Sequence, residues 1–100
     1  MSVETYQTLK TTLRLVNKRG LHARASHKFV ECAEQFDALI EVASHNNVST
    51  ETVVADSVME LLLLGAAFGE DITITASGSD AQLAIAALST LVNSKFGENE

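Results

Sequence analysis

The segment Gly20-Leu21-His22-Ala23-Arg24 contains the residue types in this chain that could perform chemistry. A neutral histidine is a nucleophile whose protonation changes near neutral pH. An arginine two residues later presents a rigid fork of donors that matches phosphate oxygens, and Gly20 gives the backbone freedom just before His22. The segment therefore predicts that His22 binds or carries a phosphoryl group and that Arg24 contacts it. The structural alternative is a histidine that only caps a helix or lies on the surface.

Cations gather around His22, where a helix is predicted to begin. Four of them fall within eleven residues, namely Lys18, Arg19, Arg24 and Lys28. The N-terminus of a helix already carries about half a positive charge and prefers acidic side chains, so these cations indicate that an anion binds among them. The first-turn N–H groups of Ala23, Arg24 and Ala25 would donate to a phosphate there, as other helix N-termini do. The same positive charges favour the neutral, nucleophilic form of His22.

Hydrophobic periodicity predicts the elements that position this segment. Strands are predicted over residues 11–16, 38–44, 49–55 and 72–77, with a turn at His45-Asn46-Asn47 between the second and third. Helices are predicted over 24–36, from Ser57 to about Gly65, and from Ser79 onward. Ser57-Val58-Met59-Glu60 matches a capping box, and Ser79-Asp80-Ala81-Gln82 is a second capping signal. In the short helix we expect Leu61 to face the core and Met59 to face solvent.

The element order β-α-β-β-α-β-α predicts an α+β fold. We expect an open-faced β-sandwich, in which a four-stranded antiparallel sheet has three helices on one face. One domain spanning 1–100, with its core at about 11–96, agrees with a hydrophobic fraction of 46% and a charged fraction of 20%. Residues 1–9 and 97–100 are expected to be frayed ends.

Composition excludes several classes of function. Thirteen acids against seven bases give a net charge of −6, so neither a nucleic acid nor an anionic membrane is expected as a partner. The longest apolar run, residues 61–68, is too short to span a membrane, and the acidic N-terminal segment does not look like a signal peptide. Cys32 has no partner for a disulfide. We therefore expect a cytoplasmic protein in which Cys32 is a small core residue.

A metal site is not expected either. The histidines stand at positions 22, 27 and 45, without a cysteine or carboxylate cluster at ligand spacing. For His27, pairing with Glu31 one helical turn later is favoured. A secondary phosphate contact and a metal pair with His22 are the alternatives.

The loop around His22 resembles the active loop G-L-H-A/T-R-P-A of the histidine-containing phosphocarrier (HPr) family of the bacterial phosphotransferase system. The resemblance extends over about residues 11–96. Asp56-Ser57-Val58-Met59 with Leu64-Gly65 is similar to the family's second helix, and Gly78-Ser79-Asp80 with Ala87-Leu88 is similar to the start of its last helix. The element order, which was obtained from periodicity, agrees with the family's fold.

The resemblance implies a role for each matching residue. His22 would accept a phosphoryl group on Nδ1 from Enzyme I and pass it to a histidine of an Enzyme IIA, with Arg24 on the phosphoryl oxygens. Ser57 matches a serine that a dedicated HPr kinase phosphorylates in some members. Val58, Met59 and Leu62 match the apolar face that docks partners. No cofactor is implied. We expect a monomer that forms a covalent phosphohistidine, rather than an enzyme with a pocket for a small substrate.

Two departures from the family pattern affect these expectations. Ala25-Ser26 stands where the motif has Pro, and together with Arg19-Gly20 this favours the nitrogen-regulatory branch over the sugar branch. Asp56 and Glu60 replace basic or neutral residues and argue against phosphorylation of Ser57. The alternative function is a regulatory docking module of the same fold that acts through its second helix, without chemistry at His22.

Overall fold

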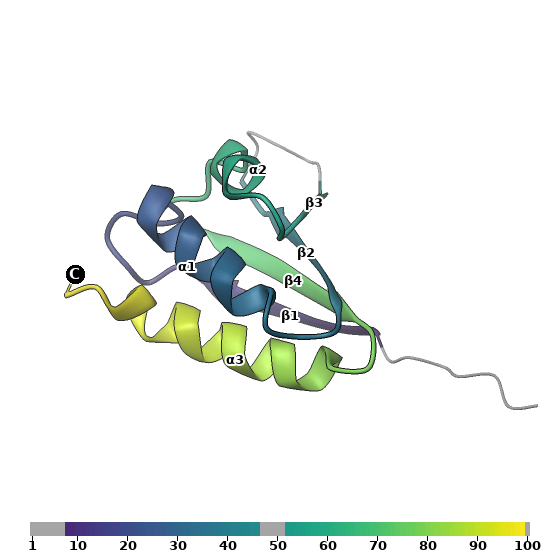
Figure 1. Ribbon diagram of the computed structural model, residues 1–100. Coiled ribbons are helices and arrows are strands. Elements are labelled where there is room, and N and C mark those ends of the chain that lie inside the picture. Colours follow the sequence, from purple (N-terminus) through teal and green to yellow (C-terminus); the bar gives the residue numbers. More distant parts are fainter. Residues whose placement is uncertain (1–7, 47–51, 100) are drawn as a thin grey trace, which may run out of the picture.

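The computed structural model describes residues 8–46 and 52–99, and Figure 1 shows their arrangement. The strands are β1 (Thr8–Arg14), β2 (Leu39–Ser44), β3 (Thr52–Val54) and β4 (Asp71–Ser77). The α-helices are α1 (Ala23–Ala33), α2 (Val58–Leu63) and α3 (Ala81–Asn93), and α3 is followed by a short 3-10 helix, η1 (Lys95–Gly97). The predicted element order is confirmed, with η1 added at its end.

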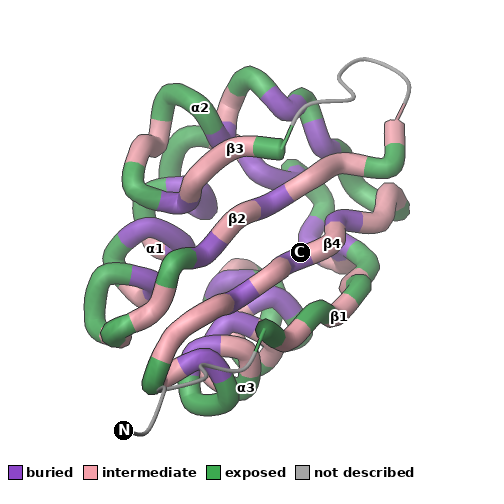
Figure 2. The backbone as a smooth tube through the Cα atoms, turned by 90° about the vertical axis from the view of Figure 1, so that its right-hand side faces the viewer, coloured by how far each residue is buried: buried purple, intermediate pink, exposed green. Residues whose placement is uncertain are grey.

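The four described strands form one antiparallel sheet in the order β1-β4-β2-β3. Along the central strand β4, Ile72, Ile74 and Ala76 are buried, and the residues between them are partly exposed, as the alternating colours of Figure 2 show. Side chains of a strand alternate between its two faces, so the sheet has one dry and one wet face. The helices cover the dry face (Figure 1), which confirms the predicted architecture.

The core lies between the sheet and the helices. Its largest fully buried side chains include Leu15, Phe29, Leu88 and Phe96. Cys32 is partly buried against this cluster, and burial raises the pKa of its thiol, which favours the protonated form. The described part of the chain contains no helix long and apolar enough to cross a membrane.

Some predicted boundaries are wrong. β1 begins at Thr8 and ends at Arg14, because it pairs with the whole length of β4, from Thr8 opposite Ser77 to Arg14 opposite Asp71. α1 ends at Ala33 rather than at residue 36, since the next residues close tighter turns. β3 is described only from Thr52, and Asn47 with residues 49–51 lies outside the described residues.

The two capping signals have different outcomes. Ser57 Oγ accepts a hydrogen bond from the Glu60 N–H at 3.3 Å, which confirms the cap of α2. The predicted cap of α3 by Ser79 is wrong, because the N-cap residue is Asp80 and the Asp80 side chain makes no capping hydrogen bond. It accepts a hydrogen bond from the Asp37 N–H at 2.8 Å, and Ser79 Oγ donates to the Asp37 carboxylate at 2.9 Å. The start of α3 is thus hydrogen-bonded to the turn after α1. A local capping pattern does not reveal this partner, because it lies far away along the chain.

The C-terminal segment folds back onto α1. Of residues 97–100, which were expected to be frayed, Glu98 is hydrogen-bonded to Asn17 and His22, and Glu100 lies outside the described residues. Phe96 is buried, and Lys28 Nζ donates a hydrogen bond to its carbonyl oxygen at 2.6 Å. Lys95 and Phe96 both have positive φ angles, 61° and 56°, which reverse the chain after α3. The segment therefore returns to the start of α1, and Figure 1 shows these two parts of the chain on the same side of the molecule.

Candidate functional site

His22 is the N-cap residue of α1. Its backbone is extended, with φ −74° and ψ −178°, and its carbonyl oxygen accepts the first helical hydrogen bond from the Ser26 N–H at 2.9 Å. Its ring nitrogen Nδ1 accepts a hydrogen bond from the Arg24 N–H at 3.3 Å. The Nδ1 side of the imidazole therefore faces the first turn of α1, through the Arg24 N–H.

The loop before His22 packs closely against the segment that follows α2. The Leu21 N–H donates to the Ala66 carbonyl at 3.1 Å, and Leu21 is buried. Gly20 has a φ of +61°, and a Cβ atom there would lie 2.6 Å from the Ala66 carbonyl oxygen. Glycine alone satisfies both the left-handed backbone and the close approach, so it sets the position of the loop.

The C-terminal segment supplies a third side chain to this site. His22 Nε2 is hydrogen-bonded to Oε2 of Glu98. The other oxygen, Oε1, accepts from Asn17 Nδ2 at 3.0 Å, and the same Nδ2 donates to the Gly20 carbonyl at 2.8 Å. Asn17 is completely buried. The side chains of Asn17, Glu98 and His22 therefore form one hydrogen-bonded chain that starts in the core.

Sequence analysis missed both Asn17 and Glu98. Nothing in their local spacing connects them to His22, because Glu98 is 76 residues away along the chain. A usable signal did exist. Phe96 is a large aromatic residue placed after the last helix, and such a residue close to a chain end is a candidate anchor for the core.

Glu98 is an ionised carboxylate in a sheltered position. Partial burial opposes ionisation, but hydrogen bonds from Asn17 and His22 and attraction to His22 and Lys28 outweigh it, so the pKa of Glu98 lies below its usual value. The side chains of His22 and Glu98 are 17% and 13% exposed. His22 is thus largely covered, and Glu98 of the C-terminal segment lies against the Nε2 edge of its ring.

A shallow hollow lies beside the His22–Glu98 contact. It has a volume of about 280 Å³, and its lining residues are Arg19, Arg24, Lys28, Gly97, Glu98 and Asn99. Three of the four predicted cations therefore line one space. Lys18, the fourth, does not line it. Positive side chains around an open space at a helix N-terminus can hold an anion the size of a phosphoryl group.

The predicted docking face on α2 is partly exposed. Met59 is 69% exposed and Leu61 is buried, as expected, while Val58 and Leu62 are intermediate. Leu63 at 71% and Phe68 at 61% are also exposed, and sequence analysis missed them. Four consecutive leucines at 61–64 gave no periodicity from which their orientation could be read.

His27 does not join the site. Its Nδ1 lies 3.3 Å from Oε1 of Glu31, and both side chains are 64% exposed, which confirms the predicted pairing one helical turn apart. Among the described residues, no three potential metal ligands come together.

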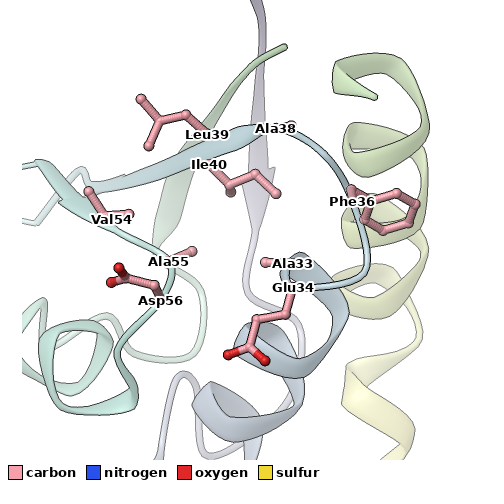
Figure 3. A pocket seen from close by; sticks show the side chains of 9 residues that line it. All are labelled: Ala33, Glu34, Phe36, Ala38, Leu39, Ile40, Val54, Ala55 and Asp56. Carbon is pink, nitrogen blue, oxygen red and sulfur yellow. The ribbon is translucent and has the colours of Figure 1, made fainter. Parts of the chain in front are cut away.

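A second cavity, of about 250 Å³, lies at the opposite end of α1 (Figure 3). Its walls come from the end of α1, from β2 and from residues 54–56. Most of its lining is apolar, and Figure 3 shows the Glu34 and Asp56 carboxylates on one side of it. None of the residues around His22 lines this cavity, so it is separate from the candidate site.

Comparison with known proteins identifies the family. Residues 9–94 match the family described as "PTS HPr component phosphorylation site", where PTS denotes the phosphotransferase system. The chain belongs to the HPr family. It is 40% identical to the phosphocarrier protein HPr of Neisseria meningitidis serogroup A and 41% identical to the phosphocarrier protein NPr of Escherichia coli K12. Both alignments cover 92% of this chain and 99% of the relative.

A solved structure supports the HPr fold. HPr-C-His from Thermoanaerobacter tengcongensis superimposes with a TM-score of 0.82 at 37% sequence identity, over 92% of this chain and 99% of the other. The expected family and its fold are therefore both confirmed.

Proposed function

We propose that His22 is the residue of this chain that carries the phosphoryl group, and that Nδ1 is the atom that bonds to it. As a member of the HPr family, the chain is a phosphocarrier that transfers a phosphoryl group from Enzyme I to Enzyme IIA. The observation that carries the proposal is that the two ring nitrogens of His22 have different hydrogen-bond partners. Nε2 is hydrogen-bonded to Glu98, whereas Nδ1 accepts a hydrogen bond from the Arg24 N–H in the first turn of α1.

The transfer step follows from the different partners of Nδ1 and Nε2. The Nδ1 lone pair attacks the phosphorus of phosphorylated Enzyme I, and the bond from phosphorus to the donor breaks, with its electron pair leaving on the donor. The proton on Nε2 stays in place, so the imidazole becomes positively charged and Glu98 lies next to that charge. Transfer to Enzyme IIA runs through the same steps in reverse order.

The first turn of α1 would bind the phosphoryl oxygens. Arg24 offers its guanidinium group, and the N–H groups of Ala23, Arg24 and Ala25 belong to the first helical turn. Arg19 and Lys28 line the adjacent hollow. Proline has no N–H, so alanine at position 25 adds one donor where the family motif has proline. This pattern of donors suits a dianion.

The apolar face of α2 is the proposed docking surface for Enzyme I and Enzyme IIA. Met59 and Leu63 are its most exposed members, Val58 and Leu62 lie at its edge, and Phe68 extends it after the helix. The segment from Ala66 onward packs against Gly20, so this surface is continuous with the His22 loop. Exposed methionine and leucine side chains suit a surface that serves more than one partner.

Phosphorylation of Ser57 by an HPr kinase stays a prediction, which rests on the family resemblance. Ser57 Oγ caps α2, and Asp56 and Glu60 flank it. A phosphate there would meet two negative charges and would have to replace the cap. We therefore propose that Ser57 has mainly a structural role, which treatment with an HPr kinase and intact-mass measurement would test.

The remaining expectations also stay proposals. We propose a monomer, as expected from the sequence, and size-exclusion chromatography would test it. A cytoplasmic location follows from the proposed partners. Relatives of both the HPr and NPr type lie near 40% identity, so comparing sugar-branch and nitrogen-branch Enzyme I as donors is the test of the predicted nitrogen-regulatory branch.

The test of His22 is intact-mass spectrometry after incubation with phosphoenolpyruvate and Enzyme I. The wild type should gain one acid-labile phosphoryl group, and His22→Ala should gain none. His27→Ala is the matched control, because His27 lies on the same helix but pairs with Glu31, and it should be phosphorylated like the wild type. A phosphoryl group on His22→Ala would contradict the assignment. Partner binding by His22→Ala with no phosphorylation of the wild type would favour the docking-module alternative.

A further inference from the structure

We propose that Asn17 and Glu98 are positioning residues for His22, which hold its ring in the tautomer with the proton on Nε2 and so leave Nδ1 as the nucleophile. Neither residue was recognised from the sequence. The proposal rests on His22 as the phosphoryl carrier, but the tautomer itself is a property of the unphosphorylated protein and can be measured without any transfer.

The orientation of the Asn17 amide is fixed by its partners. Nδ2 lies 2.8 Å from the Gly20 carbonyl oxygen and 3.0 Å from Glu98 Oε1, and both of these atoms only accept hydrogen bonds. Turning the amide over would bring its own oxygen against two acceptors. In the present orientation Oδ1 is buried and has no hydrogen-bond partner in the described part of the chain. An unpaired buried acceptor is unfavourable, so the two bonds from Nδ2 are what hold the side chain.

Glu98 transmits this orientation to His22. With Oε1 occupied by the Asn17 amide, Oε2 is the oxygen that meets Nε2 of the imidazole. An ionised carboxylate is only an acceptor, so Nε2 must carry the proton. A neutral imidazole has a single ring proton, and Nδ1 is then unprotonated. The Arg24 N–H, which donates to Nδ1 at 3.3 Å, favours the same tautomer from the other side of the ring.

The C-terminal segment holds Glu98 in place. Phe96 is buried in the core, and its carbonyl oxygen accepts a hydrogen bond from Lys28 Nζ at 2.6 Å. Lys28 belongs to α1, the helix that His22 caps. Glu98 is therefore two residues from Phe96, which is hydrogen-bonded to the same helix that His22 caps, so α1 positions both the carboxylate and the imidazole.

This arrangement matters most after the nucleophile has reacted. When Nδ1 bonds to phosphorus, the proton remains on Nε2 and the ring becomes cationic. The carboxylate of Glu98 then faces a positive charge, so its attraction is stronger in the product and in the transition state than before reaction. An interaction that strengthens in this way accelerates the step.

Glu98→Gln is the substitution that tests the proposal. If the glutamine oxygen keeps the hydrogen bond from Asn17, its NH₂ group faces Nε2 and requires a lone pair there, which places the ring proton on Nδ1. Glu34→Gln is the matched control, because Glu34 is exposed at the far end of α1 and caps it through its backbone only. It removes the same charge without touching His22.

The first measurement is the ¹⁵N NMR spectrum of unphosphorylated protein labelled at histidine. Wild type and Glu34→Gln should show a protonated Nε2 and an unprotonated Nδ1 on neutral His22, and Glu98→Gln should shift the proton to Nδ1. A wild-type His22 protonated on Nδ1 would overturn the proposal, whether or not His22 carries a phosphoryl group. An unchanged tautomer in Glu98→Gln would overturn it as well.

The second measurement is the initial rate of phosphorylation by Enzyme I. Glu98→Gln should be slower than Glu34→Gln by at least about tenfold, since converting a tautomer-fixing carboxylate to its amide reduces turnover far more in serine proteases. A tautomer change with no change in rate would contradict a role in the reaction. Failure of the proposed function has a different signature, which is phosphorylation of His22→Ala.

Discussion

At the scale of single residues, the chemistry of His22 depends on which group faces each ring nitrogen. Arg24 faces Nδ1 and Glu98 faces Nε2. The sequence predicted His22 and Arg24 because they are two positions apart at the start of one predicted helix. Glu98 and Asn17 could not be predicted in the same way, because Glu98 reaches the site only through the chain turn at Lys95 and Phe96.

The ionisation of Glu98 predicts a pH dependence of stability. The pKa of Glu98 is lower in the folded protein than its unfolded value of about 4.3. A depressed carboxyl pKa contributes stability above the unfolded pKa, and this contribution is lost as the pH falls through the folded value. Between about pH 6 and pH 3, the wild type should lose more unfolding free energy than Glu98→Gln. Urea unfolding at several pH values measures this, and parallel curves for the two proteins would contradict it.

Arg24 predicts an effect on transfer rather than on folding. Arg24 is exposed, so Arg24→Ala should fold normally. Hydrogen bonds to charged groups contribute about 1.5–3 kcal/mol, so the phosphorylation rate should fall by roughly 10- to 100-fold. Arg14→Ala is the control, because Arg14 is exposed and pairs with Asp71 on the sheet. Equal rates for the two variants would show that Arg24 does not contact the phosphoryl group.

At the scale of elements, the position of α1 is set by the loop that precedes it. That loop packs against the segment after α2. Hydrophobic alternation predicted the strands and helices correctly because each element buries one face. Their ends were predicted less well. α1 stops at Ala33, and the Asp80 side chain binds the Asp37 N–H instead of capping its own helix. Such ends depend on partners from elsewhere in the chain.

Gly20 predicts the cost of disturbing this loop. A left-handed backbone costs a non-glycine residue about 1–2 kcal/mol, and alanine at position 20 would also clash with the Ala66 carbonyl, 2.6 Å from its Cβ. Gly20→Ala should therefore lower the unfolding free energy by more than about 2 kcal/mol. Gly69→Ala is the control, since Gly69 has a φ of +83° but no neighbouring atom within 4 Å of a Cβ. Denaturant unfolding that finds equal losses would argue against a tight contact at Gly20.

At the scale of the whole molecule, the C-terminal segment completes both the core and the candidate site. Phe96 packs among the buried residues of the core, and Glu98 reaches His22 two residues later. Fraying was predicted here because chain ends with polar residues usually fray. At Glu98 the prediction was wrong, because its carboxylate is hydrogen-bonded to Asn17 and His22.

The position of Phe96 predicts that its replacement lowers the stability of the protein and also disturbs the contact between Glu98 and His22. Phe96→Ala should lower the unfolding free energy by about 3–5 kcal/mol, because it leaves a cavity in the core. It should also release Glu98 and let His22 populate both tautomers. Denaturant unfolding and histidine ¹⁵N NMR measure the two effects. A destabilised protein whose His22 keeps one tautomer would show that the anchor and the site are independent.

The central claim is that His22 carries the phosphoryl group on Nδ1. It is tested most directly by ³¹P and ¹⁵N NMR of the histidine-labelled protein after phosphorylation by Enzyme I and phosphoenolpyruvate. We predict a single phosphorus resonance coupled to Nδ1 of His22, with the proton still on Nε2. Coupling to Nε2 of His22, or to either nitrogen of His27, would contradict the account.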